Sequence, residues 1–130
     1  MFQNLEIFRM ANALAQHSSA RQAEVAANIA NADTPGYRAG DLAPFSEVYG
    51  NSRPGDGLRA TRPGHIAVSA SAAAPTSRTE TRSGAAPNGN TVSVEAEMMK
   101  SVAIKHDHET ALSVYESARN ILRTSLGRGR

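Results

Sequence analysis

The chain has 130 residues, of which 40% are hydrophobic and 5% aromatic, and its formal net charge is +2. This length allows one domain with a small core, and the absence of cysteine excludes a disulfide framework, a thiolate metal site and a cysteine nucleophile. Because alanine supplies much of the apolar content and buries little area per residue, we expect a marginally stable monomer that gains stability from partner chains.

Proline and glycine divide the chain into three zones. All six prolines and eight of the ten glycines lie between Pro35 and Gly89. Since these residues interrupt helices, long helices are expected only in residues 1–33 and 91–130, as one helical domain built from both ends. Residues 34–90 are expected to form a turn, an extended segment and a flexible loop.

Hydropathy argues against a membrane span, since no segment approaches the roughly 18 consecutive apolar residues that a spanning helix needs. The N-terminus also lacks a basic region followed by an apolar stretch. If the protein leaves the cytoplasm, we expect export without a cleaved signal peptide.

The first zone has a heptad-like pattern in which residues recur at alternating steps of four and three, as on one face of a helix. The positions are Ile7, Ala11, Leu14, Ser18, Arg21, Val25 and Asn28, with Ile29 reinforcing the end. Ser18 and Arg21 weaken the middle of this seam. We therefore expect the seam to have several partners.

The first helix is expected to end at a defined corner. Pro35 disfavours a helical conformation at Thr34, and proline followed by glycine is the preferred central pair of a type II turn. Asn31 and Asp33 can bond nearby backbone groups, and Tyr37 offers an aromatic ring that can dock the departing chain. The candidate turn and assembly motif therefore comprises Asn28, Ile29, Asn31, Asp33, Thr34, Pro35, Gly36 and Tyr37.

In the middle zone, residues 58–60 and 65–69 are candidate strands separated by Arg-Pro-Gly turns. The stretch from Ser69 to Pro87 contains no Leu, Ile, Val, Phe or Tyr. Without apolar residues to bury, residues 70–90 are expected to form a loop that neighbours must order.

The last zone contains a second helix with clear end signals. Thr91 and Ser93 offer N-caps, and Glu95 and Glu97 place negative charge in the first turn, so the helix should begin near Val94 and end at Gly127. A second seam with steps of three and four follows: Ile104, His108, Ala111, Tyr115, Ala118, Leu122 and Ser125.

These patterns predict a mainly α fold, in which long N- and C-terminal helices pair as a coiled-coil hairpin around an extended, loop-rich or small β middle segment. Such a chain is expected to be a structural assembly subunit rather than an enzyme. The residues expected at the helix seam and interface are Ile7, Leu14, Val25, Ile104, Ala111, Tyr115, Ala118 and Leu122.

The run from Asn28 to Tyr37, Asn-Ile-Ala-Asn-Ala-Asp-Thr-Pro-Gly-Tyr, resembles the signature of the bacterial flagellar basal-body rod protein family, and its proximal rod subunits in particular. The last zone resembles the family as well, with Asn-Thr-Val at residues 90–92 and Ile-Leu-Arg-Thr at residues 121–124. The resemblance implies that the terminal helices line an axial tube and that the segment after the turn packs outside it.

The resemblance also implies partners and a location. A proximal rod subunit would assemble with copies of itself, with other proximal rod subunits and with the FliE adaptor, after export by the flagellar type III apparatus. It would lie in the periplasmic part of the basal body, transmit torque and enclose the export channel. No catalysis and no cofactor are implied.

Two alternative functions are another flagellar axial subunit and a small basic DNA-binding helical protein. The arginines are spread along the chain and are not clustered with aromatic stacking residues, which favours a solvated face over a nucleic-acid surface. Asp33-Thr34 resembles the start of an aspartic protease loop, but Pro35 stands where that loop needs glycine. The catalytic interpretation is therefore disfavoured.

His106 and His108 raise the question of a metal site. Side chains that are two positions apart on a helix point in different directions, so these histidines cannot share one ion. No metal is therefore expected. Met98 and Met99 are interpreted as core or interface packing. For Asn28 and Asn31 two interpretations stay open: plain polar residues at a helix end, or side chains that hydrogen-bond across subunits.

Overall fold

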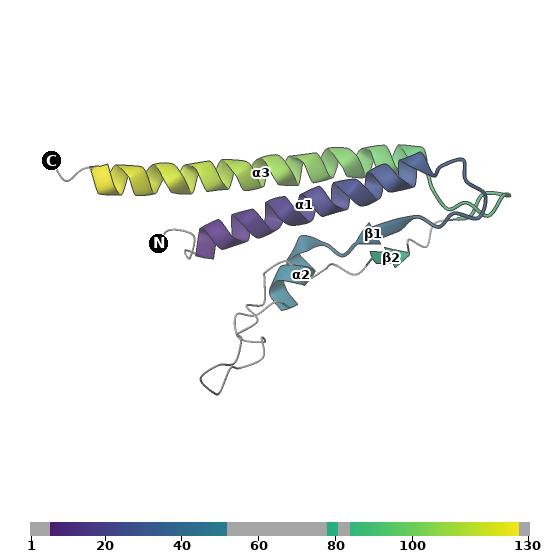
Figure 1. The fold of residues 1–130 in the computed structure, drawn as a ribbon, viewed down its shortest axis with the longest axis horizontal. Helices are drawn as coiled ribbons and strands as arrows, with labels where there is room; N and C mark the ends of the chain where they lie inside the picture. Colours follow the sequence, from purple (N-terminus) through teal and green to yellow (C-terminus); the bar gives the residue numbers. More distant parts are fainter. Residues whose placement is uncertain (1–5, 52–77, 81–83, 128–130) are drawn as a thin grey trace, which may run out of the picture.

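The computed structural model of the chain describes residues 6–51, 78–80 and 84–127. Along the chain these residues form helix α1 (Glu6–Ala30), strand β1 (Gly40–Leu42), helix α2 (Phe45–Asn51), strand β2 (Arg78–Glu80) and helix α3 (Val94–Gly127). Figure 1 shows α1 and α3 side by side and antiparallel, with the start of α1 and the end of α3 toward one end of the molecule and the corner at the other. The mainly helical fold with paired terminal helices and a small middle sheet is confirmed.

The ends of α3 follow the expected signals. The helix begins at Val94 and ends at Gly127. The Ser93 hydroxyl accepts a hydrogen bond from the Ala96 amide at 3.4 Å, which gives one free N–H of the first turn a partner. Among the helices that the structure describes, none is long and apolar enough to cross a membrane.

Small side chains fill most of the contact between α1 and α3. Val25 of α1 and Ile104 of α3 are buried. They are accompanied by the buried alanines Ala11, Ala111 and Ala118. Because alanine keeps neighbouring backbones close, the two helices can pack tightly while burying little area per residue.

Larger aromatic side chains form the contact between the start of α1 and the second half of α3. The rings of Phe8 and Tyr115 meet edge to face, with centroids 5.0 Å apart. Phe8 is buried, whereas Ile7 is 44% exposed, so Phe8 rather than Ile7 is the buried residue at this end of the helix pair, and a role for Ile7 at an interface stays a prediction. Adjacent helical residues lie about 100° apart around the axis, and the larger aromatic ring takes the inward position.

After the corner, the chain runs back along α1 (Figure 1). β1 pairs with β2 in antiparallel register, with Gly40 opposite Glu80 and Leu42 opposite Arg78. The short helix α2 follows and was not expected from the sequence. Phe45 at its start lies edge to face with the ring of His17, with centroids 5.6 Å apart, and this contact attaches α2 to α1.

The expectation that only neighbours order residues 70–90 is wrong for the part that the structure describes. β2 pairs with β1 of the same chain, and the Ala86 amide donates to the Asn90 carbonyl at 2.7 Å. The composition of the segment does not indicate this order, because the segment is held by hydrogen bonds rather than by apolar burial. The candidate strands at residues 58–60 and 65–69 lie outside the described residues.

Candidate functional site

The corner after α1 is a tight turn centred on Pro35 and Gly36. The Tyr37 amide donates to the Thr34 carbonyl at 3.3 Å, and Gly36 has a φ of 72°. Since proline at the second position fixes a negative φ there, the positive φ at the third position makes this a type II turn. The turn has the geometry that Pro-Gly favours.

Asn90 caps the corner from the far side of the sequence. Its side-chain amide nitrogen lies 3.0 Å from the Asn31 carbonyl oxygen, 2.7 Å from that of Ala32 and 2.8 Å from that of Thr34. These carbonyls have left the helical ladder, and the buried Asn90 amide gives them a donor. The end of α1 is therefore completed by a residue that stands just before α3.

Further bonds join the two sides of the corner. The Gly36 amide donates to the Asn88 carbonyl at 3.0 Å, and the Thr91 amide donates to the Tyr37 carbonyl at 3.1 Å. Gly89 has a φ of 80°, and a Cβ on it would lie 3.5 Å from the Cα of Gly36. Gly36 and Gly89, both with a left-handed backbone conformation, thus lie against one another where the segment after α1 meets the segment before α3.

Asn28 is fully buried and uses both ends of its amide within the chain. Its nitrogen donates to the Gly40 carbonyl at 2.7 Å and to Glu97 Oε2 at 3.0 Å. Its oxygen accepts from the Gly40 amide at 3.1 Å and from the Tyr37 hydroxyl at 3.4 Å. The interpretation in which Asn28 bonds across subunits is therefore wrong, because its partners are internal.

Charged side chains extend this cluster across three elements. Arg21 donates to the two Asp41 oxygens at 2.8 and 2.9 Å, a bidentate pair. Lys100 lies 2.7 Å from Glu97 Oε1 and 3.6 Å from Asp41 Oδ2. Asn28, Arg21, Asp41, Glu97 and Lys100 form what we call the polar cluster, which fixes α1, β1 and α3 to one another.

The ion pair shifts the pKa values of both partners. The hydrogen bond from Arg21 to Asp41 raises the pKa of the guanidinium, against the effect of partial burial. Partial burial acts to raise the pKa of Asp41, but the hydrogen bonds and charge of Arg21, the hydrogen bond from the Leu42 amide and the charge of Lys100 together outweigh it, and the pKa is lowered. The sequence indicates Arg21 as a weak point of the seam, but the structure pairs its charge with Asp41 of the same chain.

Arg78 of β2 links this strand to α1 and to the corner. Its guanidinium lies 3.1 Å from Glu24 Oε2 and donates to the Tyr37 hydroxyl at 3.3 Å. A Cβ on Gly40 would clash with the Arg78 side chain, so glycine leaves room for this crossing. β2 is thereby tied to both α1 and the segment after the turn.

The structure brings together part of the predicted turn motif. Asn28, Tyr37 and Asn31 take part in the internal network, and Asn31 donates to the Ala27 carbonyl at 2.8 Å. The remaining members of the motif are exposed: Ile29, Asp33, Thr34, Pro35 and Gly36. Their side of the corner faces outward, where a neighbouring molecule can contact it.

The predicted seam residues fall into three groups. Four of them are buried between the helices: Val25, Ile104, Ala111 and Ala118. Leu14 and Leu122 are half-buried. Ile7 and Tyr115 are exposed over nearly half of their surfaces, although Tyr115 contacts Phe8.

Sequence reasoning missed the roles of Asn90, Glu97 and Arg78. A glutamate in the first turn of a helix is already explained by its favourable interaction with the helix dipole. The sequence therefore gives no reason to expect that Glu97 is buried against Asn28. Asn90 lies three residues before the N-cap Ser93, and an asparagine near a helix end is the signal that could have indicated a capping role for it. His106 is exposed and His108 half-buried, and the described residues contain no group of three metal-ligating side chains.

Comparisons with known proteins agree with the resemblance of the corner. Residues 11–38 match the family model described as Flagella basal body rod protein, and this match covers most of α1 and the whole turn. The chain is 32% identical over 118 residues to the flagellar basal body rod protein FlgB of Agrobacterium fabrum strain C58, an alignment that covers 88% of each chain. The chain therefore belongs to the flagellar basal-body rod proteins, a family of structural subunits rather than enzymes.

Proposed function

We propose that the chain is a proximal rod subunit, which polymerises through its terminal helices to form the base of the axial drive shaft. The observation that carries this proposal is the polar cluster that joins α1, β1 and α3, within and beside the segment that matches the family model. A torque-bearing subunit needs its two helices held in one register, and the buried hydrogen bond between Asn28 and Glu97 within this cluster supplies that constraint.

The arrangement of the helices supports the polymerising role. Residues 1–33 and 91–130 would act as one helical domain, with residues 34–90 lying outside it. On α3, Met98, Met99 and Val102 are 58%, 77% and 72% exposed. A surface with this much exposed apolar side chain favours association.

We assign the chain a place in the basal body from this role. The subunit would lie in the periplasmic part of the rod, beside copies of itself, other proximal rod subunits and the FliE adaptor. It would reach that place through the flagellar type III export apparatus and then enclose the export channel. The relative from Agrobacterium fabrum carries the name FlgB, which supports the proximal position.

A complementation experiment tests the proposal. A strain that lacks the gene for this chain should be non-motile, and an epitope-tagged copy should restore motility and co-purify with intact basal bodies. The exposed turn residues provide a variant, Pro35→Ala with Gly36→Ala, which should block incorporation by letting the helix continue. Normal motility of the deletion strain, or absence of the tagged chain from basal bodies, would reject the proposed function.

The comparisons support a rod subunit and give no support to the DNA-binding alternative. The two differ in solution behaviour. Salt-sensitive, micromolar binding to duplex DNA by a chain that does not assemble would favour the alternative.

A further inference from the structure

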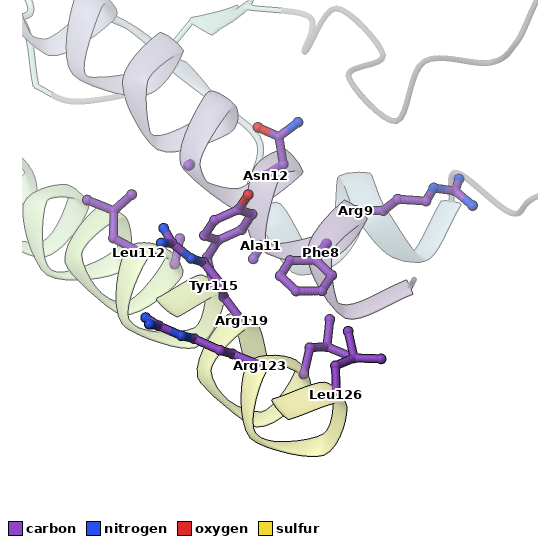
Figure 2. A pocket seen from close by; sticks show the side chains of 12 residues that line it. Phe8, Arg9, Ala11, Asn12, Leu112, Tyr115, Arg119, Arg123 and Leu126 are labelled. Carbon is purple, nitrogen blue, oxygen red and sulfur yellow. The ribbon is translucent and has the colours of Figure 1, made fainter. Parts of the chain in front are cut away.

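An apolar groove lies between the start of α1 and the last turns of α3. It has a volume of about 800 Å³. Figure 2 shows Phe8 of α1 and Tyr115 and Leu126 of α3 around the space between the helices. Leu126 is 66% exposed, so the groove offers apolar surface that the described part of the chain leaves uncovered.

Positive charge lines the same groove. Arg119 and Arg123 stand one helical turn apart on α3, beside the apolar lining (Figure 2). Within the described part of the chain, neither arginine forms an ion pair. An occupant of the groove therefore needs an apolar face that carries acidic side chains.

The first half of α3 carries such a face on the side opposite α1. Glu95, Met98, Val102 and Glu109 recur at steps of three, four and seven, which places them on one side of the helix. All four are exposed, and this stripe lies opposite the buried Ile104. The Lys105–Glu109 contact is 4.0 Å long between exposed side chains, so it holds Glu109 only weakly.

Within one chain the groove and this acidic stripe cannot meet. Both belong to the continuous helix α3, and the 28 positions between Met98 and Leu126 span about 42 Å at 1.5 Å per residue. The matching surface must come from another molecule. A second copy of this chain supplies it with apolar side chains and with the opposite charge.

We propose that the groove of one copy binds the acidic stripe of α3 from a second copy, with Arg119 and Arg123 facing Glu109. The contact uses two different surfaces, so each bound copy presents a free groove and a free stripe to the next. Contacts of this head-to-tail kind produce rings or helical assemblies. This inference rests on the proposed function, because it names the subunit contact through which the rod subunit would polymerise.

Engineered cysteines test the contact cleanly because the natural chain has none. One full-length variant carries Leu126→Cys and the other Met98→Cys, and both are co-expressed in the deletion strain with different tags. After oxidation of isolated basal bodies, we expect a disulfide-linked dimer that carries both tags. Neither variant expressed alone should give this dimer, since the pairing joins unlike positions.

A matched control places the second cysteine at Ala26, an exposed position on α1 outside the groove. Leu126→Cys with Ala26→Cys should give no dimer. If a first variant is not incorporated, Leu122→Cys with Val102→Cys repeats the test one helical turn away on each helix, since Leu122 also lines the groove. Basal bodies that contain both variants of either pair without the crosslink overturn the inference but leave the proposed function intact.

Charge reversal provides a second measurement. Arg119→Glu with Arg123→Glu should lower the yield of the crosslinked dimer at least about tenfold, because like charges then face one another. Glu109→Arg should restore part of it. A photocrosslinking residue at Leu126 that captures a different protein instead of a second copy overturns the inference, whereas loss of the wild-type chain from basal bodies would reject the proposed function itself.

Discussion

The Asn28 side chain donates a hydrogen bond to Glu97 Oε2 at 3.0 Å, which joins the end of α1 to the start of α3 across 69 positions of sequence. Both side chains are buried, and the same amide also holds the backbone of Gly40. One asparagine therefore fixes the register of the helix pair and the path of the chain after the turn.

Replacing Asn28 should have a large effect on stability. Asn28→Ala leaves the Gly40 backbone and Glu97 without buried partners, and we expect a loss of about 1–3 kcal/mol or more in the free energy of unfolding. Urea titration followed by circular dichroism measures this loss. Asn12→Ala, at an exposed asparagine of the same helix, should change stability by no more than about 0.5 kcal/mol. Equal effects of the two variants would contradict the assigned role.

The sequence predicted the elements whose signals are local. Ser93 and Gly127 mark the ends of α3, and the type II turn follows from Pro35 and Gly36, because each signal acts within a few residues. The choice of Phe8 over Ile7 was not predictable in this way. Both are apolar and adjacent, and the contact with Tyr115 on the other helix decides between them.

The polar cluster and the Asn90 cap could not be predicted from the sequence for a related reason. The pairings of Arg21 with Asp41 and of Asn90 with the end of α1 join residues that are far apart in the chain. Each side chain has an adequate local interpretation as a solvated or capping group. Only the packed arrangement of three elements shows that their partners are each other.

Asn90→Ala tests the long-range cap of α1. The carbonyl oxygens of Asn31, Ala32 and Thr34 would lose their common donor, and we expect the free energy of unfolding to fall by about 1–3 kcal/mol. Hydrogen exchange should also quicken at the last turn of α1. Asn120→Ala, on the exposed face of α3, serves as the control, and unchanged exchange in Asn90→Ala would contradict the cap.

Gly36→Ala tests the left-handed position of the turn. With a φ of 72°, an L residue at this position should cost about 1–2 kcal/mol of stability. Gly36→Asn should cost less, since asparagine tolerates this conformation better. Gly84→Ala is the control, because Gly84 has no positive φ and open space around it. Equal unfolding midpoints for all three variants would count against the turn geometry.

The Arg21–Asp41 pair predicts a loss of stability in acid. Because the pKa of Asp41 is lowered in the folded state, its contribution is present above the unfolded-state pKa of about 4 and is lost as pH falls through the folded-state value. The raised pKa of Arg21 adds no change in this range. Thermal unfolding between about pH 5 and pH 2 should therefore show a shallower decline for Asp41→Asn than for the wild-type chain. Parallel declines would exclude this linkage.

The cap that Asn90 places on α1 has a consequence for the order in which the chain becomes structured. A polypeptide that emerges with its N-terminus first presents the whole of α1 before Asn90 is available, and the two are separated by 59 positions at the Asn31 contact. During that interval the corner lacks its buried donor, and Asn28 lacks Glu97. Completion of the corner therefore waits for most of the chain, and the topology itself prevents the capped corner from forming before Asn90 is present.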